Sequence, residues 1–584
     1  TILRKTIENI KRTRNEDIIL SNINLDDKNA YDLLTTADTL GIFQCESAGI
    51  RNLMKRVKIE KFEDIVAVLA LYRPGPLRSG MVEDFIQSKN NKVAIKYMHE
   101  SLQDVLEETY GVILYQEQVM KIVNIMANYT LGEADELRRA IGKKIPEIIE
   151  ENRNKFVRKS VENGIDERVA QEVYRLIDKF GGYGFNKSHS AAYALIVYWT
   201  AYFKSNYSKE FFAAVMSTEM YNIERLSLFI NEAKEKGIIV HVPDVNKSNY
   251  EFTVEEDGIR FGLVAIKGIG INTVNGIIKI RNDETDGKYK SYDDFVHRVK
   301  QEGLNKKQLE ALIFSGALDL LDGNRREKHH SIDKIMDWSE KKFNSEEDLQ
   351  LILFGGKVHK AEDFYLEKMD EFKKIVLLNK EKEHLGVYIS DHPLNAYKSL
   401  IDMIDHTSLN ELEQIEKRNQ VNKIRLIGII SDINKITTKA SMEPMAKFKL
   451  EDFTGLIECV CFPRDFVKYG YQIYDDNVVI VEGHINNEKN KKTIITSNIS
   501  NILDLEENKY LNLYILIDEE TKDFTSDLKS LIRDNKGENA VYMAIVNDEK
   551  REIIKLSDKY KVNLSKSFIG KLVKLVGTKK IRIK

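Results

Sequence analysis

The start of one predicted helix gathers residue types suited to binding an anion. The glycine-rich run at residues 181–184 leads into polar Asn186, Lys187 and His189, and an apolar run follows. Ser188 is a suitable N-cap, so we expect a buried helix to begin near it. Backbone N–H groups at a helix N-terminus bind phosphate, and a lysine adds charge. The alternative is a capped core helix with a satisfied histidine.

A basic stretch between Arg138 and Lys159 is the second candidate for phosphate chemistry. It holds eight cationic side chains against three acidic ones, a net charge of five. Arginine forks match phosphate oxygens, and lysines supply point charge. A solvated helix face is the alternative interpretation. The four residues that we select as nucleotide or backbone contacts are Arg138, Arg139, Lys143 and Lys144.

Arg73 precedes a rigid turn, Pro74-Gly75-Pro76, in a chain that has only seven prolines. The turn fixes the direction of the chain at this point. Arg73 is therefore either aimed at a phosphate or braces the turn from outside, and bracing is the preferred interpretation.

A second glycine-rich loop, Lys267-Gly268-Ile269-Gly270, follows an apolar run and precedes a helical pattern. The next glycine is Gly276, so the dinucleotide-binding spacing fails. The pattern instead predicts a helix-hairpin-helix, in which Gly268 and Gly270 expose N–H groups to a DNA phosphate and Lys267 adds charge. A tight helix–helix turn without DNA contact is the alternative.

Other catalytic signatures are missing from the sequence. There is no Asp-x-Asp pair, Walker loop, nucleophile elbow or zinc-type cluster in the 584 residues. The three cysteines, Cys45, Cys459 and Cys461, form no Cys-x-x-Cys pair, so we expect no metal site and a reducing, cytoplasmic location.

The length predicts a multidomain protein, and the net charge gives no support for binding polyanions. The length exceeds that of one core, and we expect three or more domains. With 89 basic and 92 acidic residues the net charge is −3, so nucleic-acid binding requires local basic faces. No apolar run is long enough to span a bilayer, so we expect no membrane partner.

The elements expected to position these residues change along the chain. Helical spacing predominates up to about residue 250. Five short strand patterns follow between Ile424 and Thr496 and predict an OB barrel, in which Cys459 and Cys461 line one face. Its exposed side is a candidate single-strand surface or a plain protein-contact module. The residues considered for that surface are Lys435, Lys439, Lys447, Phe448 and Lys449.

Four ordered stretches resemble the bacterial DNA polymerase III alpha subunit, a C-family replicative polymerase. The resemblance covers essentially the whole chain. The matching residues are 71–76 with 79–82, 115–120, 131–144 and 183–194.

The resemblance implies a DNA-directed DNA polymerase, a nucleotidyltransferase that uses Mg²⁺ held by palm aspartates. Those aspartates, with the PHP, palm and thumb domains, are expected to precede Thr1, so we expect no catalytic residue here and no activity from this chain alone. Implied partners are primer-template DNA, single-stranded template, dNTP, the sliding clamp, and the clamp-loader and proofreading subunits. The alternative is a non-catalytic DNA-binding or clamp-binding accessory protein.

The predicted fold is mainly helical fingers at 1–250 and a tandem helix-hairpin-helix at 251–330. A clamp-binding segment and linker at 331–420, an OB domain at 421–505 and a small α/β partner-docking domain at 506–584 follow.

An apolar island lies between acidic residues 346–348 and the pair Gly355-Gly356, in what we expect to be an exposed loop. It resembles the short clamp-binding peptide of replicative polymerases, with Ile352 as the departure from the pattern. An apolar turn packed on a neighbouring domain is the alternative. The predicted clamp contacts are Gln350, Leu351, Leu353 and Phe354.

Overall fold

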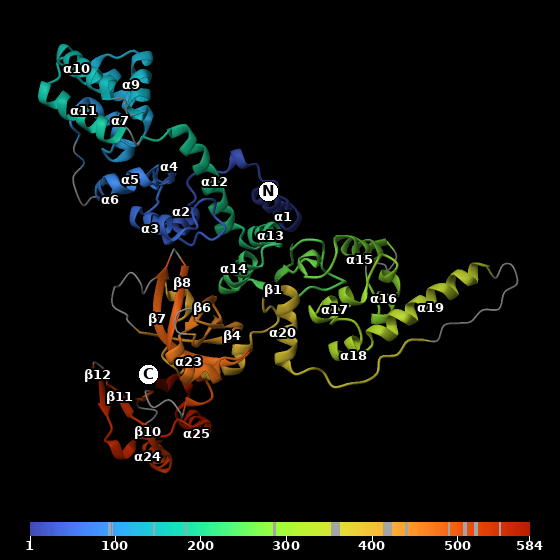
Figure 1. The fold of residues 1–584 in the computed structure, drawn as a ribbon. Helices are drawn as coiled ribbons and strands as arrows, with labels where there is room; N and C mark the ends of the chain where they lie inside the picture. The colour runs from blue at the N-terminus through green and yellow to red at the C-terminus, as the bar shows by residue number, and fades with distance from the viewer. Residues whose placement is uncertain are drawn as a thin grey trace. The chain divides into compact units, whose positions relative to one another are not determined.

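The computed structural model describes most of the chain. The described residues are 1–90, 95, 97–143, 146–181, 184–283, 288–351, 363–412, 423–438, 442–488, 491–505, 511–518, 524–547 and 550–584. They divide into two compact units, Thr1–Asn305 and Lys306–Lys584, and Figure 1 labels most of their helices and several of their strands. The five-part domain division stays a prediction.

The first unit is helical over its first 235 residues, as the spacing of apolar residues predicts. Its helices are α1 (Ile2–Arg14), α2 (Lys28–Thr36), α3 (Ala48–Val57), α4 (Phe62–Leu71), α5 (Pro74–Ser79), α6 (Met81–Lys89), α7 (Gln103–Leu106), α8 (Gln116–Ala127), α9 (Leu131–Lys143), α10 (Pro146–Glu162), α11 (Glu167–Gly181), α12 (Lys187–Asn206), α13 (Ser208–Glu219) and α14 (Ile223–Glu235).

Helix α12 is the long helix of this region and packs against α2, α4 and α13 (Figure 1). Polar side chains fix it in place at several levels. The Ser190 hydroxyl donates to the Val66 carbonyl of α4 at 2.7 Å. The Tyr198 hydroxyl donates to the Asn24 carbonyl at 2.7 Å. These two hydroxyls are therefore satisfied, whereas the buried Trp199 indole nitrogen of the same helix has no hydrogen-bond partner among the described residues.

The N-cap of α12 is Asn186, so the prediction of Ser188 is wrong by two residues. The Asn186 side-chain oxygen accepts from the His189 N–H at 2.8 Å, the usual reach from N-cap to N3. Ser188 is exposed in the first turn.

A small sheet and two further helices complete the first unit. The sheet has the order β1-β3-β2, formed by β1 (Ile239–His241), β2 (Thr253–Val254) and β3 (Gly258–Arg260). Helices α15 (Ile271–Asp283) and α16 (Tyr292–Lys300) follow it.

The second unit begins with helices. They are α17 (Lys306–Phe314), α18 (Arg325–His330), α19 (Ile332–Leu351), α20 (Lys374–Leu385) and α21 (Lys398–Ile401). Helix α19 continues through the acidic residues to Leu351, so Gln350 and Leu351 end a helix where a loop is predicted. Leu353 and Phe354 lie outside the described residues.

The predicted OB barrel is confirmed as a closed five-stranded barrel of order β4-β5-β6-β8-β7. Four strands are longer than predicted, and β6 ends one residue before the predicted Phe462. The strands are β4 (Ile424–Thr437), β5 (Pro444–Glu451), β6 (Leu456–Cys461), β7 (Val478–Glu488) and β8 (Lys491–Asn501). Helix α23 (Pro463–Tyr469) lies between β6 and β7 in the chain.

The two barrel cysteines are alternate residues of β6 and lie on the same buried face, as predicted. Cys459 and Cys461 belong to the barrel core, and burial raises the pKa of both thiols. Phe448 is also in this core, with 1% of its surface exposed, so its assignment to a single-strand surface is wrong. Strand alternation sends Lys447 outward and Phe448 inward. Lys435 is exposed, Lys449 pairs with Asp432 at 2.8 Å, and Lys439 lies outside the described residues.

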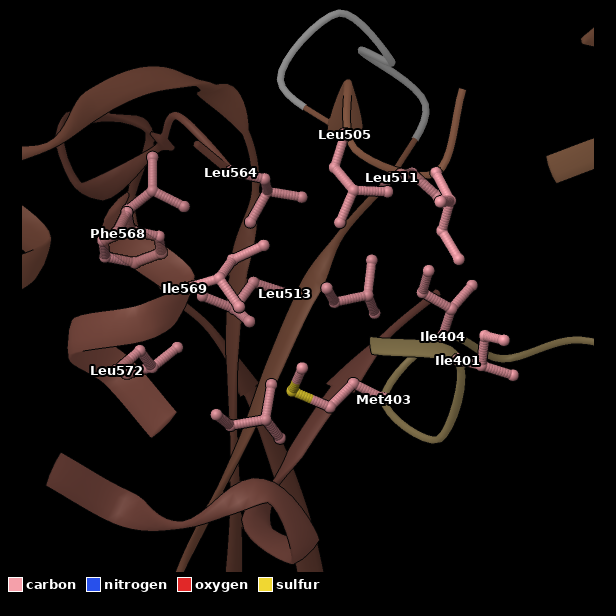
Figure 2. Close-up of a cluster of buried hydrophobic side chains, with 14 of the residues drawn as sticks. Ile401, Met403, Ile404, Leu505, Leu511, Leu513, Leu564, Phe568, Ile569 and Leu572 are labelled. Carbon is pink, nitrogen blue, oxygen red and sulfur yellow. The ribbon is translucent and has the colours of Figure 1, made fainter. Parts of the chain in front are cut away.

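The C-terminal α/β module is also confirmed. Its sheet has the order β12-β11-β9-β13. Figure 2 shows part of its core, in which Leu513 faces Phe568, Ile569 and Leu572. The elements are β9 (Leu513–Ile517), α24 (Thr525–Asp534), β10 (Lys536–Asn539), β11 (Val541–Asn547), β12 (Lys550–Lys555), α25 (Lys566–Val576) and β13 (Ile581–Ile583).

Candidate nucleotide and nucleic-acid interface

A backbone bridge brings the two conspicuous motifs of the first unit together. Tyr115 and Phe185 form an isolated parallel β-bridge. The Gln116 N–H donates to the Phe185 carbonyl at 2.9 Å, and the Phe185 N–H donates to the Leu114 carbonyl at 3.1 Å. Buried Gln118 braces the turn, because its side-chain oxygen accepts from the Leu114 and Tyr115 N–H groups at 2.8 and 2.9 Å. The start of α8 therefore fixes the start of α12.

A carboxylate already lies at the N-terminus of α12. The Lys187 N–H donates to both Glu117 oxygens at 3.1 and 3.0 Å, and the Asn186 amide donates to one of them at 3.0 Å. The Lys187 ammonium forms an ion pair with Glu108 at 2.6 Å. Negative charge at a helix N-terminus is stabilising. A phosphate at this helix end would therefore have to displace Glu117.

Aromatic side chains form a line along the exposed side of α12. The His189 ring lies 4.5 Å from the Tyr193 ring and 5.4 Å from the Phe185 ring, between centroids. Phe43 stacks on Tyr193 at 5.6 Å. At the other end, the Arg73 guanidinium lies 4.5 Å from the Phe185 ring centroid. This is a cation–π contact, and the bracing role of Arg73 at the proline turn stays a prediction.

Arg138 and Arg139 of α9 share one carboxylate. Arg138 contacts Asp135 through two nitrogens at 2.9 and 2.7 Å, and Arg139 contacts its other oxygen at 2.8 Å. Hydrogen bonding from Arg138 lowers the pKa of Asp135. Arg138 also donates to the Gln116 side-chain oxygen at 3.1 Å, which links α9 to the bridge.

Two lysines of α10 in the basic stretch are paired as well. Lys155 and Lys159 contact Glu133 at 2.8 and 3.3 Å, and both lie over the Tyr129 ring. The hydrogen bond from Lys155 is the main reason why the pKa of Glu133 falls to about 2. The sequence window that gave five net charges begins after Glu133 and Asp135. It therefore overstates the charge presented by this surface.

We call the convergence of these groups the α9–α12 junction. It unites five of the eight predicted nucleotide-binding residues: Arg73, Arg138, Asn186, Lys187 and His189. Arg139 adjoins it through Asp135. The side chain of Lys143 and the whole of Lys144 lie outside the described part of the chain. Sequence reasoning missed six further members of the junction, which are Gln116, Glu117, Phe185, Tyr193, Glu108 and Phe43. The first four of these lie inside matching motifs.

The predicted DNA hairpin is an exposed loop before α15. Gly268 has φ +90°, a conformation that favours glycine. Lys267, Gly268 and Gly270 are exposed. The element before the loop is a short 3₁₀ helix, Leu263–Ala265, in place of an α-helix.

A second hairpin repeats this backbone before α17. Gly303 has φ +92° and is followed by an apolar residue, as Gly268 is. The residue before it is Glu302, where the first hairpin has Lys267. A Cβ on Gly276 would lie 2.5 Å from the Glu302 Cβ, so Glu302 packs closely on α15.

The described side chains offer a poor binding site for magnesium. Among the residues that the structure describes, the group of three potential ligands is His241, Glu255 and Asp257. Arg260 contacts both oxygens of Glu255 at 2.9 and 2.7 Å. Mg²⁺ prefers oxygen ligands, and a guanidinium beside the site opposes a cation. This set therefore does not match a two-magnesium polymerase site.

Within the described ranges, no helix has the length and apolar character needed to cross a membrane.

These features define a multidomain protein of nucleic-acid-binding type. They are a helical unit in which ion-paired cations meet aromatic rings, two glycine hairpins, and an OB barrel. Family profiles agree with this class. Residues 1–164 match the bacterial DNA polymerase III alpha subunit finger domain, residues 237–328 a helix-hairpin-helix motif, and residues 424–502 an OB-fold nucleic acid binding domain.

Curated relatives named DNA polymerase III subunit alpha match nearly the whole chain. The Bacillus subtilis protein is 36% identical over 100% of this chain and 51% of its own length. The Borreliella burgdorferi protein is 37% identical over 95% and 49%, and the Aquifex aeolicus protein 37% over 94% and 45%. The chain spans about half the length of the curated relatives it matches. It belongs to the DNA polymerase III alpha subunit family and corresponds to the C-terminal half of that subunit, with its finger, helix-hairpin-helix and OB regions.

Proposed function

We propose that this chain is the nucleotide-binding and DNA-binding half of a replicative DNA polymerase. The α9–α12 junction is the observation that carries the proposal, because it brings three separate motifs into one surface. The motif at 115–120 supplies Gln116, the motif at 131–144 supplies Arg138 and Arg139, and the motif at 183–194 supplies Lys187 and the aromatic line.

The chemistry of the junction suits an incoming dNTP or the template backbone. Arg138 and Arg139 exchange Asp135 for phosphate oxygens, which accept the same kind of charge-assisted hydrogen bonds from a guanidinium. The ring of Tyr193 or His189 offers a stacking surface for a base. Asn186 acts chiefly as the N-cap, and Lys187 reaches phosphate only by leaving Glu108.

The catalytic metals belong elsewhere in this proposal. The two Mg²⁺ ions of a polymerase neutralise charge on the attacking and leaving oxygens. No Asp-x-Asp pair occurs in the chain, and the His241 group does not match. The proposed division of labour is that this chain holds the nucleotide and DNA while palm carboxylates hold the metals.

Primer extension tests this division. The purified chain with primer-template, dNTPs and Mg²⁺ is expected to extend no primer, while an added N-terminal half restores synthesis. A photoreactive azido-purine dNTP is expected to label peptides between Gln116 and Tyr193. Extension by the chain alone at the rate of an intact polymerase would contradict the division. Labelling confined to other segments would contradict the nucleotide site.

Further partners extend the same proposal. The peptide Gln350–Phe354 would bind the sliding clamp, and the exposed Gly268 hairpin would bind duplex phosphates. Clamp-loader and proofreading subunits would contact the assembled polymerase. The competing function is a non-catalytic DNA-binding and clamp-binding accessory protein. It predicts that the N-terminal half adds nothing to synthesis.

A further inference from the structure

The C-terminal sheet carries a cation–tyrosine–tyrosine–cation row across its four strands. In the strand register, Lys555 of β12 pairs with Tyr542 of β11, Tyr542 pairs with Tyr514 of β9, and Tyr514 pairs with Arg582 of β13. Residues paired in register point to the same face of a sheet. All four side chains therefore lie on one face.

That face is the one turned away from the core. The alternate residues of β9, Leu513, Ile515 and Ile517, belong to the hydrophobic core together with Phe568 and Leu572 of α25. Figure 2 shows this covered side. Because successive strand residues alternate between faces, Tyr514 and Tyr542 lie on the opposite side.

The two tyrosines form a parallel stack. Their ring centroids are 4.5 Å apart and their planes differ by 10°. Both residues are half-buried, and the Lys584 ammonium lies 5.4 Å from the Tyr514 centroid. The next row of the same face is apolar, with Ile553 paired to Ala544 and Ala544 to Leu516. Ile553 is 56% exposed.

Exposed cations flank this apolar centre on both sides. Lys555 and Arg582 are exposed, and no carboxylate pairs with either among the residues that the structure describes. Lys584 has one distant acidic partner, Asp405 at 3.8 Å, and both side chains are more than half exposed. We call these residues the open face: Lys555, Tyr542, Tyr514, Arg582 and Lys584, with Ile553 and Leu516.

We propose that the open face binds single-stranded nucleic acid. Aromatic rings beside apolar side chains accept unpaired bases by stacking, and flanking cations accept the phosphates that run past them. A base extends the two-ring stack beyond Tyr542, while Lys555 and Arg582 hold the backbone on either side. A duplex is excluded as the ligand because its bases are not free to stack. This site is separate from the α9–α12 junction and the hairpins, so it stands or falls independently of the nucleotide site.

Photo-crosslinking locates the site directly within the full 584-residue chain. A thymidine oligonucleotide that carries 5-iododeoxyuridine is irradiated with the protein, and crosslinked peptides are identified by mass spectrometry. Crosslinks are expected at Tyr514 or Tyr542. Tyr365, which is 81% exposed elsewhere in the second unit, is the control ring and is expected to remain unlabelled. Crosslinks in the OB strands with none at Tyr514 or Tyr542 would overturn the proposal and leave this face to a protein partner.

Paired variants separate stacking from charge. Tyr514→Leu with Tyr542→Leu is expected to lower the total yield of crosslinks to peptides of the C-terminal sheet about tenfold, in line with one lost stacked base. Tyr514→Phe with Tyr542→Phe is expected to retain it, which separates lost stacking from misfolding. Equal loss in both pairs would contradict base stacking.

The charge test measures the local salt dependence of the same crosslink. Lys555→Ala with Arg582→Ala is expected to reduce its slope against log salt by about 1.4, since each single-strand phosphate contact contributes about 0.7. The matched control is Lys571→Ala with Lys574→Ala, two exposed lysines on α25 behind the sheet. An unchanged slope in the first pair, or an equal change in the control pair, would overturn the proposal.

Discussion

The α9–α12 junction and the open face of the C-terminal sheet both place cations beside aromatic rings. The junction pairs its cations closely with acids, whereas in the open face Lys584 has a distant acidic partner, Asp405 at 3.8 Å. Arg138 and Arg139 share Asp135, and Lys187 contacts Glu108. Lys555 and Arg582 make no ion pair within the described residues. A paired cation binds phosphate only by exchanging partners, so its geometry selects the ligand. An unpaired cation binds any polyanion with strong salt dependence.

The same contrast appears between the two glycine hairpins. They share a backbone conformation, with φ +90° at Gly268 and +92° at Gly303. Lys267 precedes the first glycine and Glu302 the second. Backbone geometry alone therefore does not decide which hairpin faces a phosphate, because charge at one position separates them.

The largest expected effect concerns the proposed clamp-binding peptide, which would bind its partner through apolar side chains in place of charged ones. Leu353→Ala with Phe354→Ala is expected to weaken clamp binding a hundredfold or more, since burying each side chain contributes roughly 1.5–3 kcal/mol. Surface plasmon resonance with immobilised clamp measures the loss. DNA binding and the melting temperature should remain nearly unchanged.

The control for the clamp peptide is Leu320→Ala with Tyr365→Ala, two apolar side chains that are 69% and 81% exposed in the same unit. It should bind the clamp normally. Normal clamp binding by the Leu353 and Phe354 variant would remove the peptide assignment, and early unfolding would make the island part of a core.

At the junction, Arg138→Ala with Arg139→Ala is expected to weaken primer-template binding about tenfold to a hundredfold, since hydrogen bonds to charged groups contribute about 1.5–3 kcal/mol. Fluorescence anisotropy at several salt concentrations measures the affinity and its slope. Asp135→Asn is expected to act in the opposite direction and tighten binding, because it releases both arginines.

Arg153→Ala with Arg158→Ala is the matched control for these arginines. Both are exposed on α10 and pair only loosely within their helix, at 3.6 and 3.8 Å. An equal loss in this control would reduce the junction to a nonspecific basic face. Weaker binding by the Asp135→Asn variant would show that the ion pairs position the arginines and do not compete with DNA.

Ion pairing in the first unit extends to the interior, where it is expected to make stability depend on pH. Burial raises the pKa of Glu232 to about 7, opposed by Lys204 at 2.5 Å. The folded state then holds a proton that the unfolded chain loses above about pH 4.5. The free energy of unfolding should therefore fall as pH rises from 4.5 through 7.

Glu232→Gln is expected to remove up to about 3 kcal/mol of that fall, measured by urea denaturation at pH 5 and pH 8. Asp38, which shares Lys204 with Glu232, has a lowered pKa and titrates below this window. An unchanged slope in the variant would place the proton elsewhere.

The smallest expected effect separates the hairpins. Lys267→Glu is expected to weaken duplex binding about threefold to fivefold, because one phosphate contact is lost and a repulsion is added. Glu302→Gln, the matched change in the second hairpin, should leave duplex binding nearly unchanged. If both variants behave alike, the hairpin charges do not distinguish the two loops.

Local patterns were sufficient for much of the architecture. Alternation along β6 placed Cys459 and Cys461 on one buried face, and apolar spacing defined the helices before residue 236. The motifs around Gln116, Arg138 and Lys187 also identified three of the segments that meet at the junction. These successes share a cause, since residues within a few positions of one another interact through backbone geometry that the sequence encodes directly.

The tertiary structure alone decided how charges and rings are paired. Glu117 lies at the end of a helix that begins 70 residues later in the chain, and Tyr514 meets Tyr542 only because β9 and β11 adopt one register. Phe448 and Lys447 were assigned to one surface until the barrel separated them. Pairing depends on distances between segments remote in sequence, which composition and spacing do not specify. The sequence therefore determined which groups this protein has, and packing decided which of them remain available to a ligand.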